Sequence, residues 1–277
     1  MTRLANGALR GLLTAVLVAT PSLLLPGVSA DTAQVVSLVG LAMALLITIE
    51  YASLYPSLVE FRDAPPFNRI RFLGLFVTVF LLSILMRGEQ DASGFTLFVI
   101  ALGHVAGAIL DFPLSPIRLL LSTLPEGTDT AAVLMLRAAM GLAFFAAFFS
   151  FIVFYLILKL ADWPRAMGAF NVWINLPTFD PTAGGDVVTR LRRDGRLNLA
   201  LGALLPFLVP AVARAGNTVF GPALVDDGQT LIWMVAAWAS LPLSLFMRGV
   251  AMMRVADMIA EMRRRSTAAP HAATAIA

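Results

Sequence analysis

The chain has 277 residues, of which 59% are hydrophobic and 13% charged. Soluble domains are on average about half apolar and about a quarter charged, so part of this apolar surface is expected to face lipid. The chain contains no cysteine, which excludes disulfides, cysteine-ligated zinc and iron–sulfur clusters. The 20 basic and 17 acidic residues lie unevenly, and the basic clusters sit beside apolar segments. This pattern is typical of the cytoplasmic face of a membrane protein or of contact with anionic lipid, and not of a nucleic-acid partner.

Seven segments are long and apolar enough to cross the hydrocarbon core, which takes about 20 residues. They are residues 11–30, 33–56, 70–87, 94–112, 131–160, 197–214 and 229–248. The bilayer offers no partner to an unpaired backbone, and strand-like alternation is missing. The sequence therefore predicts one all-α polytopic transmembrane bundle over residues 1–265, followed by a disordered tail at 266–277.

Two stretches of this bundle have open interpretations. Residues 1–30 contain Arg3 and Arg10, an apolar run and a small-residue ending, which fits either a secretory signal or a retained first span. Residues 113–124 are apolar but short, so they lie on the membrane interface or dip into it and return.

Basic residues set the expected orientation. Two clusters lie two spans apart, so both can face the cytoplasm: Arg190, Arg192, Arg193 and Arg196, and then Arg263, Arg264 and Arg265. Seven spans then place the C-terminus inside and the N-terminus outside, in what we expect to be a bacterial inner membrane. Arg62, Arg69 and Arg71 also look cytoplasmic, which is possible only if one segment fails to cross.

The loop at 161–196 interleaves aromatic with polar residues, which predicts a segment lying at headgroup depth. Asp186 is placed to cap a short basic helix that leads into the sixth span. Beyond the seventh span the helix is expected to continue to Arg265. Its methionine-rich apolar stripe packs on the bundle, lies on lipid or docks a partner.

Ionisable groups inside spans are costly in lipid and mark candidate sites. Five fall within or at the ends of the predicted spans: Glu50, His104, Asp111, Arg137 and Arg214. With seven spans, all five lie in the same half of the bilayer. Gly103 and Gly107 have the spacing at which membrane helices pack closely.

Three interpretations of this polar cluster stay open. It is a set of structural ion pairs, Glu50 with Arg137 and Asp111 with an arginine. It lines the polar cavity of a small carrier. Or His104 is an axial ligand of a haem or chlorin. No metal site is implied, because the chain has only two histidines and no cysteine.

The familiar enzyme motifs are missing from the sequence, including the phosphate-binding loop, the dinucleotide-binding glycines, the zinc-protease helix and the nucleophile elbow. We therefore expect a non-enzymatic accessory, scaffold or assembly subunit that packs against another membrane complex. The alternatives are a small secondary transporter or ion-coupled carrier built on the polar cluster, and a cofactor-binding membrane subunit that uses His104.

Overall fold

The computed structural model describes residues 3–167, 170–180, 182, 184–216 and 227–274. Within these residues six helices are long and apolar enough to cross a membrane. They are α1 (Arg3–Leu24), α2 (Ala30–Ala52), α3 (Phe67–Gly88), α6 (Thr130–Leu160), α8 (Val187–Gly216) and α10 (Gly228–Thr274). The shorter elements are α4 (Gly94–Leu110), α5 (Pro116–Leu121), α7 (Val172–Asn175) and the 3₁₀ turn η1 (Arg165–Met167). The described chain has no strand, so the predicted all-α polytopic bundle is confirmed.

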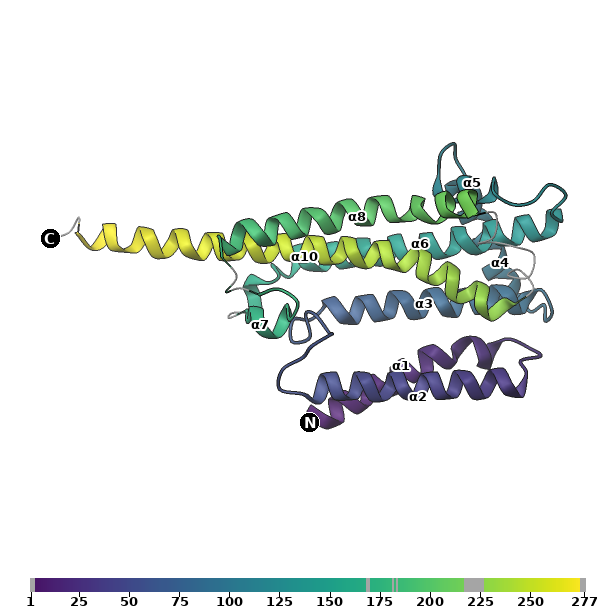
Figure 1. Cartoon of the computed structure of the whole chain (residues 1–277), viewed down its shortest axis with the longest axis horizontal. Helices are drawn as coiled ribbons and strands as arrows, with labels where there is room; N and C mark the ends of the chain where they lie inside the picture. The colour runs from purple at the N-terminus through teal and green to yellow at the C-terminus, as the bar shows by residue number, and fades with distance from the viewer. Residues whose placement is uncertain (1–2, 168–169, 181, 183, 217–226, 275–277) are drawn as a thin grey trace.

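The long helices alternate in direction along the chain, so that each runs antiparallel to the next long helix (Figure 1). We call the end where α1 begins and α10 ends the terminal face, and the other end the opposite face. At the opposite face the end of α1 meets the start of α10, where the Gln229 amide donates a hydrogen bond to Ser22 Oγ at 2.9 Å. Both ends of the described chain therefore lie on the terminal face.

Helix α4 does not cross the bundle. At the terminal face Phe67 of α3 packs on Phe154 of α6, with ring centroids 5.7 Å apart. At the other end Gly103 of α4 lies against both Leu85 of α3 and Ala138 of α6. Helix α3 therefore ends on the face where α6 begins, and α4 joins them there (Figure 1). The seventh predicted crossing is wrong, because 17 helical residues reach only about 26 Å and α4 packs on the neighbouring helix ends instead.

Two hydrophobic cores hold the helices together. The first lies between α1, α3, α4, α5, α6, α8 and α10 and includes the buried Ile117 and Leu120 of α5. The second lies near the terminal face and includes Trp163 and Phe179, which are 3% and 4% exposed. Both belong to the loop for which the sequence predicts a position at headgroup depth, and the structure places these two side chains inside the protein, where they form part of the second core.

Helix α8 begins at Val187, so the basic stretch and the predicted sixth span form one continuous helix. Its capping residue was predicted correctly: Asp186 Oδ2 accepts a hydrogen bond from the Thr189 amide at 2.9 Å. Helix α10 continues to Thr274, so it includes residues 266–274 of the predicted tail, while 275–277 lie outside the described residues. Along the predicted methionine-rich stripe, Met258 is buried, Met253 is half-buried and Met262 is 49% exposed, so the stripe packs on the bundle over part of its length.

The basic residues divide unequally between the two faces. Of the 20 lysines and arginines, only four belong to helix ends or short helices at the opposite face, and the other sixteen belong to the terminal face. The four are Arg87, Arg118, Arg137 and Arg214. With six spans all the basic clusters share one face, which removes the conflict found in the sequence. It also places both ends of the described chain on the same face of the bundle, whereas seven spans would place them on opposite faces.

Candidate functional site

The five candidate residues do not share one level of the membrane. Glu50 lies at the terminal face, beside a loop whose aromatic residues pack near Phe154 of α6. Asp111 lies at the opposite face, where it forms an ion pair with Arg137 of α6. The 17 residues between Arg137 and Phe154 correspond to about 26 Å along the helix. The expected pairing of Glu50 with Arg137 is therefore not formed.

Glu50 organises the loop that joins α2 to α3. Its carboxylate accepts hydrogen bonds from the amides of Ser57 (3.1 Å), Leu58 (3.1 Å) and Val59 (3.2 Å), and from Ser57 Oγ (2.6 Å). The side chain is buried, and three adjacent amides compensate its negative charge. This arrangement satisfies Glu50 within its own loop and ends α2 in a fixed turn.

The same loop is held from its other side by a buried arginine. Arg62 Nη1 donates to the carbonyl oxygens of Glu50 (3.0 Å) and Ser53 (2.7 Å). The next residue, Asp63, contacts α7: its amide donates a hydrogen bond to Asn175 Oδ1 at 3.0 Å. The loop therefore joins α2 to α7, an element more than 100 residues further along the chain.

Glu60 links this loop to the middle of α10. Arg248 binds its carboxylate with two donors, Nε at 2.6 Å and Nη2 at 2.8 Å, and Thr178 Oγ1 donates to the same group at 2.5 Å. Burial by itself raises the pKa of Glu60, but the hydrogen bonds from Arg248 and Thr178 and the charge of Arg248 outweigh it. The pKa therefore lies below its ordinary value of 4.5. This contact could not be predicted from the sequence, because its partners are 188 residues apart and no local pattern marks it.

On the opposite face Asp111 lies between two arginines. Arg118 Nε donates to Asp111 Oδ1, Arg118 Nη2 donates to the Asp111 carbonyl at 2.8 Å, and Arg137 Nη1 is 3.6 Å from Asp111 Oδ2. The aspartate side chain is 12% exposed, and the buried Nε of Arg137 has no hydrogen-bond partner among the described residues. The pair joins the end of α4 to α6 and to α5. Arg214 is exposed at the end of α8 on the same face.

The two glycines of α4 lie against α6. A methyl group on Gly103 would be 3.3 Å from the Ala138 carbonyl oxygen, and one on Gly107 would be 2.7 Å from that of Arg137. His104, between them, is half-buried and forms no hydrogen bond with the described part of the chain. The glycine face thus brings two helix backbones into contact, and the imidazole sits beside this contact.

The basic clusters near the terminal face form ion pairs within the protein. Arg192 pairs with Asp257 (2.8 Å), and Arg263 pairs with Asp186. The hydrogen bond from Arg263 and that from the Thr189 amide lower the pKa of Asp186 to about 2. Further contacts join Arg193 to Asp194, Arg265 to Glu261 and Arg190 to the Phe179 ring. Arg196 donates only to a backbone carbonyl of its own helix, and Arg264 is exposed.

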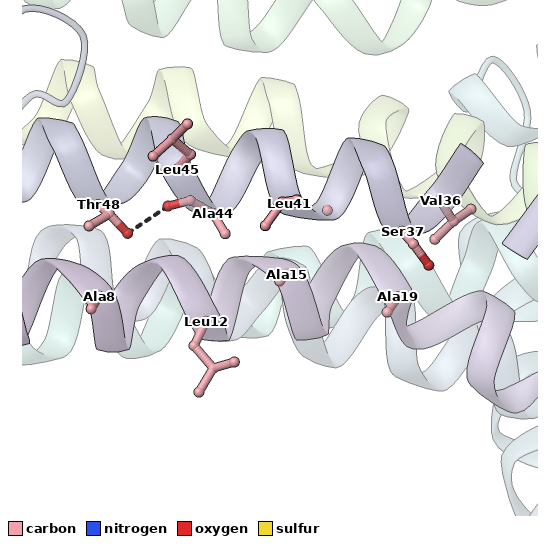
Figure 2. A pocket seen from close by; sticks show the side chains of 11 residues that line it. Ala8, Leu12, Ala15, Ala19, Val36, Ser37, Leu41, Ala44, Leu45 and Thr48 are labelled. Atoms are coloured by element: carbon pink, nitrogen blue, oxygen red, sulfur yellow. Dashed lines mark hydrogen bonds between the residues drawn. The ribbon is translucent and has the colours of Figure 1, made fainter. Parts of the chain in front are cut away.

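A groove of about 540 Å³ runs along the outer side of the α1–α2 hairpin. Figure 2 shows its lining side chains, which come from both helices. Most of them are small or aliphatic: Ala8, Leu12, Ala15, Ala19, Val36, Ser37, Gly40, Leu41, Ala44, Leu45 and Thr48. The groove lies on the side of α1 away from Leu17 and Thr20, which face the bundle and are buried.

The described residues hold no group of three or more histidine, aspartate or glutamate side chains that could bind a metal ion. The geometry offers an ion-paired opposite face, an interlocked terminal face and an apolar groove on the hairpin. No known protein family, characterised protein or solved structure matches this chain.

Proposed function

We propose that this protein is a non-enzymatic accessory or scaffold subunit of a bacterial inner membrane, which binds a transmembrane helix of another integral protein in the α1–α2 groove. The observation that carries the proposal is the isolation of α2. Its 23 residues pack on α1, and only Gly40 and Glu50 among them are buried within the described chain. An apolar span with so little of its own protein around it is available to a partner.

The shape of the groove favours a helix as its occupant. The lining residues of α1 extend from Ala8 to Ala19, which is about 17 Å along the helix axis. Small side chains on this floor let another backbone approach closely, and close packing at small residues is what drives association of helices in lipid. We therefore assign the groove to an apolar transmembrane helix of a partner protein.

The charge distribution supports a cytoplasmic terminal face. Sixteen of the 20 basic residues belong to that face, and cytoplasmic segments of membrane proteins carry the excess of lysine and arginine. Both termini would then lie in the cytoplasm. The short connections at the opposite face would lie on the outer side of the membrane.

The two alternative functions draw less support from the arrangement of the residues. A carrier built on the five polar residues needs them at one level, whereas Glu50 and Asp111 belong to opposite faces. A haem or chlorin bound by His104 would need space beside α4. Residues of α6 and α3 occupy the space next to the two flanking glycines.

Site-specific photocrosslinking in native membranes tests the scaffold function. A crosslinking amino acid at Ser37, an exposed position lining the groove, is expected to give one discrete adduct with another membrane protein. The matched control is Ala42, which is exposed on the other side of α2 and does not line the groove. Equal labelling from both positions, or an adduct with twice the mass of this chain, contradicts the proposal.

Leucine substitutions complete the test. Ala8→Leu combined with Ser37→Leu fills the groove from both helices and is expected to abolish co-purification of the partner that the crosslinking identified, measured in mild detergent without a crosslinker. Ala42→Leu adds the same kind of side chain outside the groove and is expected to leave co-purification unchanged. A partner that stays bound to the filled groove contradicts the proposal.

A further inference from the structure

Four arginines in the first parts of α1 and α3 have no carboxylate within ion-pair distance in the described part of the chain: Arg3, Arg10, Arg69 and Arg71. They lie within the first eight residues of α1 and the first five of α3, and both helices begin at the terminal face. The helix dipole places additional positive charge at such ends. The ends of membrane spans lie at headgroup level. Anionic groups outside the protein can therefore neutralise the positive charge of these four arginines.

Two of these arginines lie around one tyrosine. The Arg10 guanidinium is 4.2 Å from the centroid of the Tyr51 ring. Tyr51 also interacts with Asn68 of α3, and Arg71 lies one turn after Asn68 on the same face of that helix. Arg71 Nε donates to Ser244 Oγ of α10 at 3.1 Å. The carboxylate that interacts electrostatically with Arg71 is that of Glu60. Both oxygens of this carboxylate already accept hydrogen bonds from Arg248. Positive charge at this junction of α1, α2, α3 and α10 is therefore in excess.

The apolar surface below Arg10 is open. Arg10, Leu13 and Leu17 share one face of α1, because they are three and four residues apart. Leu17 is 5% exposed where α1 packs on the bundle, whereas Leu13 is 43% exposed. An apolar chain can therefore lie along Leu13 beneath the two guanidinium groups.

We propose that Arg10 and Arg71 bind the phosphate of an anionic glycerophospholipid from the leaflet at the terminal face, with an acyl chain lying along Leu13. Guanidinium groups match phosphate oxygens in geometry and charge, and both remain charged at the membrane surface. Tyr51 and Ser244 supply further polar contacts at the headgroup. Inorganic phosphate shares the headgroup chemistry, but only a lipid also covers the exposed Leu13. This site lies on the side of α1 that faces the bundle, so it does not depend on the groove assigned to a partner helix.

Native mass spectrometry of the full-length protein in detergent, titrated with phosphatidylglycerol, tests the site. Each arginine near an anionic headgroup contributes to binding by about fivefold. Arg10→Gln and Arg71→Gln are therefore each expected to weaken lipid retention by about fivefold, while Arg10→Lys and Arg71→Lys keep most of it. The matched control is Arg264→Gln, an exposed arginine on the far part of α10, which is expected to leave retention unchanged.

Two further arms separate a bound lipid from diffuse charge or free anion. Phosphatidylcholine is expected to bind at least fivefold more weakly than phosphatidylglycerol, and inorganic phosphate is expected not to displace the lipid. Leu13→Trp changes no charge but fills the acyl position, so it is also expected to lower retention. Circular dichroism and a monodisperse elution profile verify that each variant is folded. The proposal is overturned by unchanged retention in the Gln variants, by an equal loss in Arg264→Gln, or by displacement with inorganic phosphate.

Discussion

Gly107 of α4 and Gly141 of α6 touch backbone to backbone. A methyl group on Gly141 would lie 2.2 Å from the amide nitrogen and 2.3 Å from the Cα of Gly107. Such a contact has no flexible side chain that could move aside, so it fixes α4 against the first half of α6. The contact holds α4 at the opposite face and places Asp111 beside Arg137.

Gly141→Ala is therefore expected to destabilise the protein by about 1–3 kcal/mol, the usual cost of overpacking a filled contact. Thermal unfolding of the purified protein in mild detergent measures the effect. Gly94→Ala is the control, because a methyl group there would meet nothing within 4 Å. Equal unfolding midpoints for the two variants would contradict a rigid backbone contact between α4 and α6.

The six-span topology predicts the accessibility of single cysteines. Because the natural chain has no cysteine, each introduced thiol is the only one present. Asp91→Cys after α3 and Glu126→Cys before α6 are expected to react with a membrane-impermeant maleimide from the same side, and Ser266→Cys from the other side. Labelling of Asp91→Cys and Glu126→Cys from different sides would mean that α4 crosses the membrane.

The contact between Glu60 and Arg248 predicts a pH dependence of stability. Since the pKa of Glu60 is lowered in the folded protein, its contribution is present above pH 4.5 and is lost as the pH falls through the lowered value. Glu60→Gln is expected to cost about 2 kcal/mol at neutral pH, the size of a charge-assisted hydrogen bond, and to reduce the loss of stability in acid. Unfolding midpoints between pH 7 and about pH 3 measure both effects. Glu89→Gln, at an exposed position, is expected to behave as the unmodified protein does.

Asp111 and its two arginines predict an asymmetric response to substitution. Asp111→Asn leaves two arginines without their carboxylate and is expected to destabilise the protein by about 1–2 kcal/mol, since Asp111 is largely buried but Arg118 is half exposed. Arg137→Met removes a buried nitrogen that lacks a hydrogen bond, and Arg118 still pairs with Asp111. It is expected to change stability by less than about 1 kcal/mol. Equal losses in the two variants would contradict this account of the pair.

Local properties of the sequence were sufficient for much of the fold. The helices, the capping role of Asp186 and the extension of α10 follow from hydropathy, length and capping residues, each of which acts within a few turns. The excess of basic residues is likewise a property of composition. For these reasons the all-α bundle could be predicted before any contact was known.

The number of crossings, in contrast, was decided by packing. Whether residues 94–112 cross depends on where Gly103 and Gly107 find a partner surface, and that surface belongs to α6. One crossing fewer reverses the direction of every later helix relative to α2, which moves Asp111 to the face opposite Glu50. Only the tertiary structure could decide which charges meet, since the level of a charged residue in the membrane depends on the path of the whole chain before it.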